Sequence, residues 1–121
     1  MERAETARTY YRAIDDGEYD RLGDVLAPGF VHDRPDRTLS GADRFVRFMR
    51  EERPMTDTTH AVDALYHGDD DAGRDAGDTR NAGGEVAVRG RLRRRGEDLF
   101  GFVDVFAFEG AEIARLRTYT R

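Results

Sequence analysis

The spacing of apolar residues along this chain changes once, and the change limits the folds that the chain can adopt. Before about residue 54, apolar side chains recur every three or four residues, the period of a helix buried on one side. From residue 58 onward they alternate with polar side chains, the period of a strand. The predicted helices span residues 2–16, about 19–26 and 42–53, and the predicted strands span 30–33, 58–67, 85–95, 99–108 and 112–119.

The predicted order is therefore α-α-β-α-β-β-β-β, with the last four strands joined as a meander. Helices followed by antiparallel strands indicate an α+β domain, in which the helices pack on one face of a curved sheet. The 121 residues have the length of one domain, so we expect residues 1–121 to form a single unit. Residues 68–84 hold no large apolar side chain, which predicts a mobile loop between two strands.

Composition narrows the classes of function. The chain has no Cys, which excludes disulfides and cysteine-ligated zinc. A net charge of −5 argues against a nucleic-acid partner. No apolar run approaches the roughly 18 residues of a membrane span, and the charged N-terminus lacks the apolar stretch of a signal peptide, so we expect a cytoplasmic protein. All 20 basic residues are Arg, which fits either a high-salt cytoplasm or the codon bias of a GC-rich genome.

The predicted strand 99–108 carries the first candidate for chemistry, Asp104. Side chains alternate across a strand, so one face holds Phe100, Phe102, Asp104, Phe106 and Phe108, and the other holds Leu99, Gly101, Val103, Val105 and Ala107. Both faces are apolar, which predicts that helices or a partner subunit cover them. Partial desolvation raises the pKa of a carboxyl, and such a group suits a general acid, a general base or a neutral hydrogen-bond donor. The alternative is a structural Asp that is paired with an Arg of a neighbouring strand.

Four further polar residues are weaker candidates. Asp33 ends the short strand Phe30-Val31-His32-Asp33, where catalytic side chains are common, but it could equally form a turn before Pro35. His32 is either a surface histidine or a base. Tyr10 and Tyr11 lie on the first helix, and one of them must face the sheet more squarely, either for packing or to donate a hydrogen bond into a pocket.

Several local motifs together resemble the nuclear transport factor 2-like superfamily, and within it the SnoaL-like and ketosteroid isomerase group. The motifs are Tyr10-x-x-Ala13 with Asp15, Asp16 and Gly17; residues 22–26; Phe30-Val31-His32-Asp33; Ser40-Gly41; and Val103-Asp104-Val105-Phe106-Ala107-Phe108 with Gly110, Ile113 and Arg117. The resemblance implies a cone, in which a bent sheet wraps a long helix and leaves an apolar pocket. It also implies a homodimer through the outer sheet face.

The resemblance to the isomerase also suggests roles for individual residues. In that enzyme a Tyr of the first helix and a protonated Asp of a late strand form the oxyanion hole, and a second Asp moves the proton. Counting back from Gly17 places Tyr10 at the Tyr position, Asp33 at the base position and Asp104 at the neutral-Asp position. In polyketide cyclases of the group, a residue at the position of Asp104 is thought to act as acid and base.

Two hypotheses follow from the sequence and the resemblance. The first is an enzyme that moves a proton next to a carbonyl on a small apolar substrate, by isomerase, cyclase or dehydratase chemistry, with Asp33 as base and with Tyr10 and Asp104 as donors to the oxyanion. No cofactor and no metal are implied. The second is a non-catalytic module for small-molecule binding or dimerisation. The residues expected to line the pocket are Phe45, Phe102, Phe106, Phe108 and His32.

Overall fold

The computed structural model describes residues 2–68 and 84–121, so all but the ends of the predicted mobile segment 68–84 lie outside the described residues. The helical elements are α1 (Arg3–Asp16), α2 (Tyr19–Asp24), α3 (Ala42–Arg47) and the π-helical turn η1 (Phe48–Glu52). The strands are β1 (Leu26–Asp33), β2 (Thr38–Ser40), β3 (Thr58–His67), β4 (Glu85–Arg94), β5 (Glu97–Glu109) and β6 (Glu112–Thr120). Among the described residues, no helix is long and apolar enough to cross a membrane.

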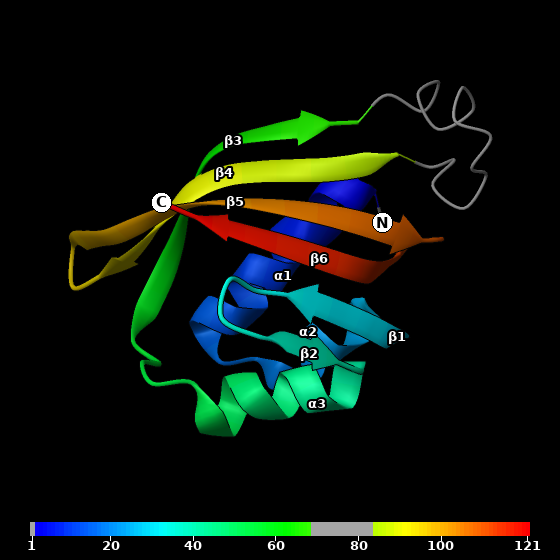
Figure 1. Cartoon of the computed structure of the whole chain (residues 1–121), viewed down its shortest axis with the longest axis horizontal. Helices are drawn as coiled ribbons and strands as arrows, with labels where there is room; N and C mark the ends of the chain where they lie inside the picture. Colours follow the sequence, from blue (N-terminus) through cyan, green and yellow to red (C-terminus); the bar gives the residue numbers. More distant parts are fainter. Residues whose placement is uncertain (1, 69–83) are drawn as a thin grey trace.

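The six strands form one mixed sheet in the order β2-β1-β6-β5-β4-β3. All neighbours are antiparallel except β1 and β6, which run parallel. Figure 1 shows α1 crossing one face of this curved sheet, with α2 and α3 beside β1 and β2. The predicted α+β class and the sequence of helices before a strand meander are confirmed. The three-residue strand β2, which pairs with β1, was not predicted because it is too short to show a period.

The first helix ends where the sequence predicts. Gly17 has a φ of 70°, the left-handed conformation that glycine adopts without a steric penalty, and its N–H bonds to the carbonyl of Ile14 at 3.2 Å. Ala7, Tyr11 and Ile14 are buried along one side of this helix. The third helix begins after Gly41, which is its N-cap, and no side chain caps it.

The strand β5 shows the predicted alternation. Its inward residues Phe102, Asp104, Phe106 and Phe108 are buried, whereas the outward Val103 is 37% exposed. The helices cover the inner face of the sheet, and the outer face is open to solvent in the single chain (Figure 1). Asp104 therefore lies on the inner face of the sheet, which the helices cover.

A glycine allows the sheet to close around the inner face. Gly90 of β4 pairs with Phe102 of β5, and a Cβ at this position would lie 2.8 Å from the Phe102 ring and would also meet the carbonyl oxygen of Ala61. A larger residue would therefore push Phe102 or β3 outward. The missing side chain lets the Phe102 ring lie against β4, where it forms one wall of the cavity described below.

Candidate functional site

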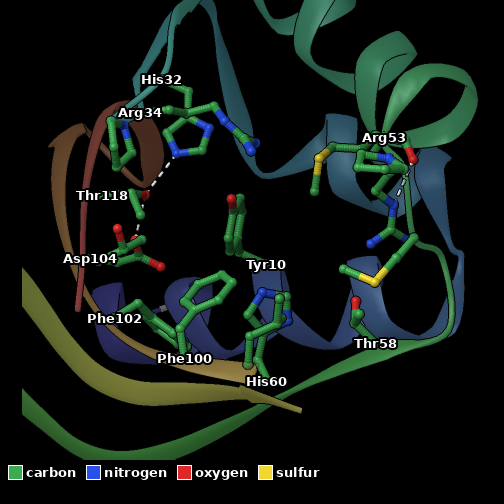
Figure 2. Close-up of a pocket in the computed structure, with 16 residues that line it drawn as sticks. Tyr10, His32, Arg34, Arg53, Thr58, His60, Phe100, Phe102, Asp104 and Thr118 are labelled. Atoms are coloured by element: carbon green, nitrogen blue, oxygen red, sulfur yellow. Dashed lines mark hydrogen bonds between the residues drawn. The ribbon is translucent and has the colours of Figure 1, made fainter. Parts of the chain in front are cut away.

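A cavity of about 260 Å³ opens between the inner face of the sheet and the helices. Its walls come from α1, the end of β1, the segment after η1, and the inward side chains of β3, β4, β5 and β6. Figure 2 shows its polar side chains turned toward a common space, with the ring of Tyr10 among them. The volume suits a small organic molecule rather than a polymer.

Asp104 lies in this cavity and is 5% exposed. The Tyr11 hydroxyl donates to its Oδ2 at 2.7 Å, and the Thr118 hydroxyl donates to its Oδ1 at 2.5 Å. Burial raises the pKa of the Asp104 carboxyl, against the opposing effect of these two hydrogen bonds. No ion pair joins it to an Arg within the described part of the chain, so the alternative of an Asp paired with a neighbouring Arg is wrong.

The tyrosine that bonds to Asp104 is Tyr11, the neighbour of the Tyr10 that the resemblance placed at the Tyr position. Successive residues of a helix point about 100° apart, and it is Tyr11 that faces β5. Tyr10 instead packs between Phe45 and Phe106, and its side chain lines the cavity. Tyr10 is 3% exposed, its hydroxyl has no hydrogen-bond partner in the described part of the chain, and burial raises its pKa.

His32 also lines the cavity, and it is buried rather than at the surface. Its Nε2 lies 2.8 Å from the Thr118 hydroxyl oxygen, so Thr118 links His32 to Asp104 (Figure 2). When Thr118 donates its single hydroxyl hydrogen to Asp104, it accepts the N–H of His32, and Nδ1 is then the unprotonated nitrogen. That nitrogen is buried and has no partner among the described residues. Burial, with the charge of Arg34 acting in the same direction, lowers the pKa of His32 to about 3.

Asp33 does not lie in the cavity, so the expectation that it shares a pocket with Asp104 is wrong. Side chains alternate along β1, and since His32 points inward, Asp33 points to the outer face. There Asp33 Oδ2 accepts two hydrogen bonds from Arg115, at 2.6 and 2.9 Å, and Oδ1 accepts one from Thr38 at 3.2 Å. The hydrogen bonds from Arg115 lower the pKa of Asp33.

Of the four phenylalanines expected around the pocket, Phe102 lines it and the other three belong to the core. Phe106 is fully buried against the rings of Tyr10 and Tyr11. Phe45 is fully buried against Phe30. These phenylalanines support the tyrosines that reach the cavity. Phe108 lies further along β5, where the Arg3 guanidinium covers its ring.

His60 of β3 lines the same cavity, and its role was not predicted from the sequence. Asp15, near the end of α1, accepts the His60 backbone N–H at 2.9 Å and contacts His60 Nδ1 at 2.6 Å. Since a carboxylate accepts hydrogen bonds, this contact places a hydrogen on Nδ1 and leaves the lone pair on Nε2. The ring packs against Tyr11 and Phe102, with centroids 5.0 and 5.7 Å apart. The period-2 pattern of residues 58–67 could have indicated that His60 faces inward.

Residues 7–116 match the SnoaL-like domain family. The chain belongs to this family. The resemblance inferred from the sequence is therefore confirmed. Among curated proteins, none matches the sequence of this SnoaL-like domain.

Three solved structures show how widely the fold of this SnoaL-like domain is shared. An NTF2-like protein of unknown function from Cytophaga hutchinsonii has 12% identity and a TM-score of 0.76, with 100% of this chain and 91% of that chain covered. A "putative ketosteroid isomerase" from Kribbella flavida has 17% identity, a TM-score of 0.73 and coverages of 98% and 76%. A "putative polyketide cyclase" from Sinorhizobium meliloti has 16% identity, a TM-score of 0.72 and coverages of 95% and 94%. These likenesses establish an NTF2-like fold.

The cavity of this SnoaL-like domain thus joins three kinds of polar group. Asp104 is a buried carboxyl whose raised pKa favours the protonated form, Tyr10 presents a hydroxyl that has no partner among the described residues, and His60 is oriented by Asp15. A protonated carboxyl and a phenol donate hydrogen bonds, and an oriented imidazole accepts a proton. No group of three or more His, Cys, Asp or Glu side chains that could hold a metal ion occurs in residues 2–68 and 84–121.

Proposed function

We propose that this SnoaL-like domain binds a small carbonyl compound in the cavity and moves a proton at the carbon next to the carbonyl. The observation that carries the proposal is the convergence of Asp104, Tyr10 and His60 on one cavity. Two of these groups are hydrogen-bond donors and one is a base. Enolate formation needs this combination, because a base must take the proton while donors stabilise the charge that develops on oxygen.

In this proposal Asp104 and Tyr10 hold the carbonyl oxygen. The Tyr10 hydroxyl has no competing partner among the described residues, so its hydrogen is available to a ligand. A protonated Asp104 keeps the bond from Tyr11 as an acceptor and donates its own hydrogen. The buried surroundings strengthen both hydrogen bonds as the oxyanion forms.

His60 replaces Asp33 as the proposed base, because Asp33 lies on the outer face. Nε2 of His60 takes the proton from the carbon, and Asp15 stabilises the resulting imidazolium through Nδ1. The electron pair of the broken C–H bond moves to the carbonyl oxygen. Return of the proton to a different carbon completes an isomerisation. Attack of the enolate carbon on a second carbonyl, whose oxygen then takes the proton from His60, completes a cyclisation.

The test is exchange of carbon-bound hydrogen in D2O. Enolisable ketones of one or two rings are incubated with the protein, and loss of the α-proton signal is followed by proton NMR. We expect exchange above the buffer rate with the native chain. His60→Gln lowers the rate by about 10²–10⁴-fold, since it removes the base. Asp104→Asn and Tyr10→Phe each lower it by up to about 10²–10³-fold, since each removes a donor.

The matched control for Asp104→Asn is Asp98→Asn on the same strand. Asp98 pairs with Arg91 and Arg93 at the surface and does not line the cavity. This variant should keep the native exchange rate. A native chain that binds the ketones but exchanges no hydrogen would overturn the proposal, as would a His60→Gln variant that exchanges at the native rate.

A second candidate function is ligand binding without catalysis. One observation favours it, because both carboxyl oxygens of Asp104 already take part in hydrogen bonds with Tyr11 and Thr118. A carboxyl held in this way could serve the architecture of the pocket alone. Tight binding of a ketone with no exchange, unchanged in His60→Gln, is the outcome that this alternative predicts.

We also propose that the outer sheet face pairs with a second copy of the chain. Val103 and Tyr119 are neighbours on this face and are 37% and 56% exposed, and Val105 follows on the same side of β5. Burying such a patch is favourable. Light scattering should show a dimer for the native chain and a monomer for Val103→Glu. Thr56→Glu adds the same charge at an exposed loop position and should remain dimeric; a monomeric native chain would contradict the proposal.

A further inference from the structure

The cavity has a positively charged residue at the side away from Asp104. Arg53 follows η1, is half-buried and lines the cavity. Figure 2 shows it across the cavity from Asp104 and Thr118, with Tyr10 between them. The apolar residues that share the lining include Met49, Met55, Leu92, Phe100 and Phe102. A ligand that fills the cavity therefore meets hydrogen-bond donors at one end and a guanidinium at the other.

Arg53 has no carboxylate partner among the residues that the structure describes. Its Nε donates to the backbone oxygen of Met49 at 2.9 Å, and its Nη2 donates to the Tyr19 hydroxyl at 3.3 Å. Neither acceptor carries a charge, and no acidic side chain forms an ion pair with it within the described ranges. Arg34, the other arginine at the cavity, is paired with Asp36 at 3.2 Å. Of the two arginines that line the cavity, Arg53 is thus the one without a carboxylate partner in the described ranges.

The two hydrogen bonds of Arg53 also leave a particular part of the guanidinium available. Arginine has five N–H donors in a planar fork, and here Nε uses one and Nη2 uses one. Within the described part of the chain, nothing accepts the two hydrogens of Nη1 or the second hydrogen of Nη2. The pair of N–H groups at the end of the fork matches the two oxygens of a carboxylate. The bond to Met49 fixes the plane of the fork, so little flexibility is lost when an anion binds.

We propose that the ligand of this cavity is an oxo acid, with its carbonyl held by Asp104 and Tyr10, an apolar middle, and its carboxylate bound by Arg53. The carbonyl half of this statement rests on the proposed function, and the carboxylate half rests on Arg53 alone. A singly charged planar anion fits better than a phosphate, because one uncompensated guanidinium and a cavity of about 260 Å³ serve a small monoanion. In a chain with a net charge of −5, this local positive charge also directs anions to the cavity.

The test compares ligands that differ only in charge. Benzoylalkanoates of increasing chain length are paired with their carboxamides, and dissociation constants are measured by isothermal titration calorimetry. We expect the native chain to bind the best-fitting carboxylate about 10- to 100-fold more tightly than its carboxamide, the range that a charge-assisted hydrogen bond supplies. Equal affinities for the two members of every pair, or no binding by any carboxylate of the series, would overturn the inference.

Variants of single arginines test which positive charge causes the preference for the carboxylate over the carboxamide. Arg53→Gln should bind the carboxylate and the carboxamide equally, and Arg53→Lys should keep part of the preference because it keeps the charge without the fork. Arg50→Gln is the matched control, since Arg50 is exposed, pairs with Glu51 and lies outside the cavity. It should keep the native preference. If Arg53→Gln retains the preference, the assignment to Arg53 is wrong. The comparison of ligands on the native chain needs no variant, so a misfolded variant leaves the test intact.

The same ligands separate this inference from the proposed function. A carboxylate preference that depends on Arg53, with no hydrogen exchange, would overturn the proton-transfer function and support the anion site. Exchange that depends on His60, with equal affinity for carboxylate and carboxamide, would overturn the anion site and support the function.

Discussion

Where β1 meets β6, the inner and outer faces of the sheet hold their polar groups in different ways. His32 and Asp33 are adjacent in sequence and point to opposite faces. On the outer face Asp33 is held by the charged Arg115, whereas on the inner face His32 and Asp104 share the neutral hydroxyl of Thr118. As a consequence, the pKa of the Asp33 carboxyl is lowered, whereas the pKa of the Asp104 carboxyl is raised.

This difference shows what kind of site the cavity is. A hydroxyl offers a hydrogen bond but no charge, so it does not offset the loss of hydration when a group is buried. The inner face therefore favours neutral forms, namely an uncharged His32 and a protonated Asp104. A site of neutral donors suits a carbonyl compound, since its charge develops only during the reaction.

The largest effect should come from His32. Its pKa is about 3 in the folded chain and near 6.5 when unfolded, so protonation favours the unfolded state. The stability that neutral His32 contributes is complete above about pH 6.5 and is lost as pH falls toward 3, at about 1.4 kcal/mol per pH unit. Urea unfolding between pH 7 and pH 4 should show this slope, and His32→Gln should remove it. His67→Gln, at an exposed position, should leave the slope unchanged; a native slope in His32→Gln would contradict the prediction.

The next effect compares two threonines that each bond to an aspartate. Thr118→Val removes the hydroxyl shared by buried His32 and Asp104, and should lower the free energy of unfolding by about 2–4 kcal/mol, because two buried groups lose a partner. Thr38→Val removes the hydroxyl that bonds to Asp33 on the outer face, where water replaces it. That change should stay within about 0.5 kcal/mol. Chemical denaturation measures both, and equal losses would show that the faces do not differ as described.

The sequence predicted the fold because the fold follows from periods that it displays directly. The change from a helical to a strand period gave the order of elements, and alternation along residues 99–108 placed Asp104 among aromatic rings. Of the two tyrosines on the first helix, counting back from Gly17 selected Tyr10, which lines the cavity, whereas the bond to Asp104 comes from Tyr11. One residue on a helix changes the direction of a side chain by about 100°, so spacing alone did not indicate which contacts each tyrosine makes.

The errors in the site have long-range causes. The direction of Asp33 depends on how β1 pairs with β6, where Asp33 lies opposite Arg117, and the two strands are some 80 residues apart in sequence. His60 becomes a candidate base only because β3 brings it to Asp15 at the end of α1. A bulge between Val62 and Ala64 also shifts the inward pattern of β3, so counting along this strand fails beyond that point. No local pattern reports such contacts.

A smaller effect is the way in which pH changes the contributions of Asp104 and Asp33 to stability. The raised pKa of Asp104 means that its contribution to stability is present below the ordinary carboxyl pKa and is lost as pH rises through the folded value. Asp104→Asn lacks this dependence, so its stability relative to the native chain should rise with pH. Asp33 has a lowered pKa, so its contribution is present above the ordinary value and is lost as pH falls. The relative stability of Asp33→Asn should therefore fall as pH rises from the acid range, and slopes of the same sign would contradict this contrast.

The smallest effect concerns salt and the ion pair between Asp33 and Arg115. The partners are 29% and 46% exposed, so the attraction acts largely through water, and Asp33→Asn should lower the free energy of unfolding by at most about 1 kcal/mol in dilute buffer. At about 1 M NaCl the screening length falls to about 3 Å, and the difference should approach zero. The effect of Thr118→Val should persist in the same salt, because it concerns hydrogen bonds between buried groups. A salt-resistant effect of Asp33→Asn would mean that a second copy of the chain buries this edge of the outer face, which connects the smallest prediction to the proposed dimer.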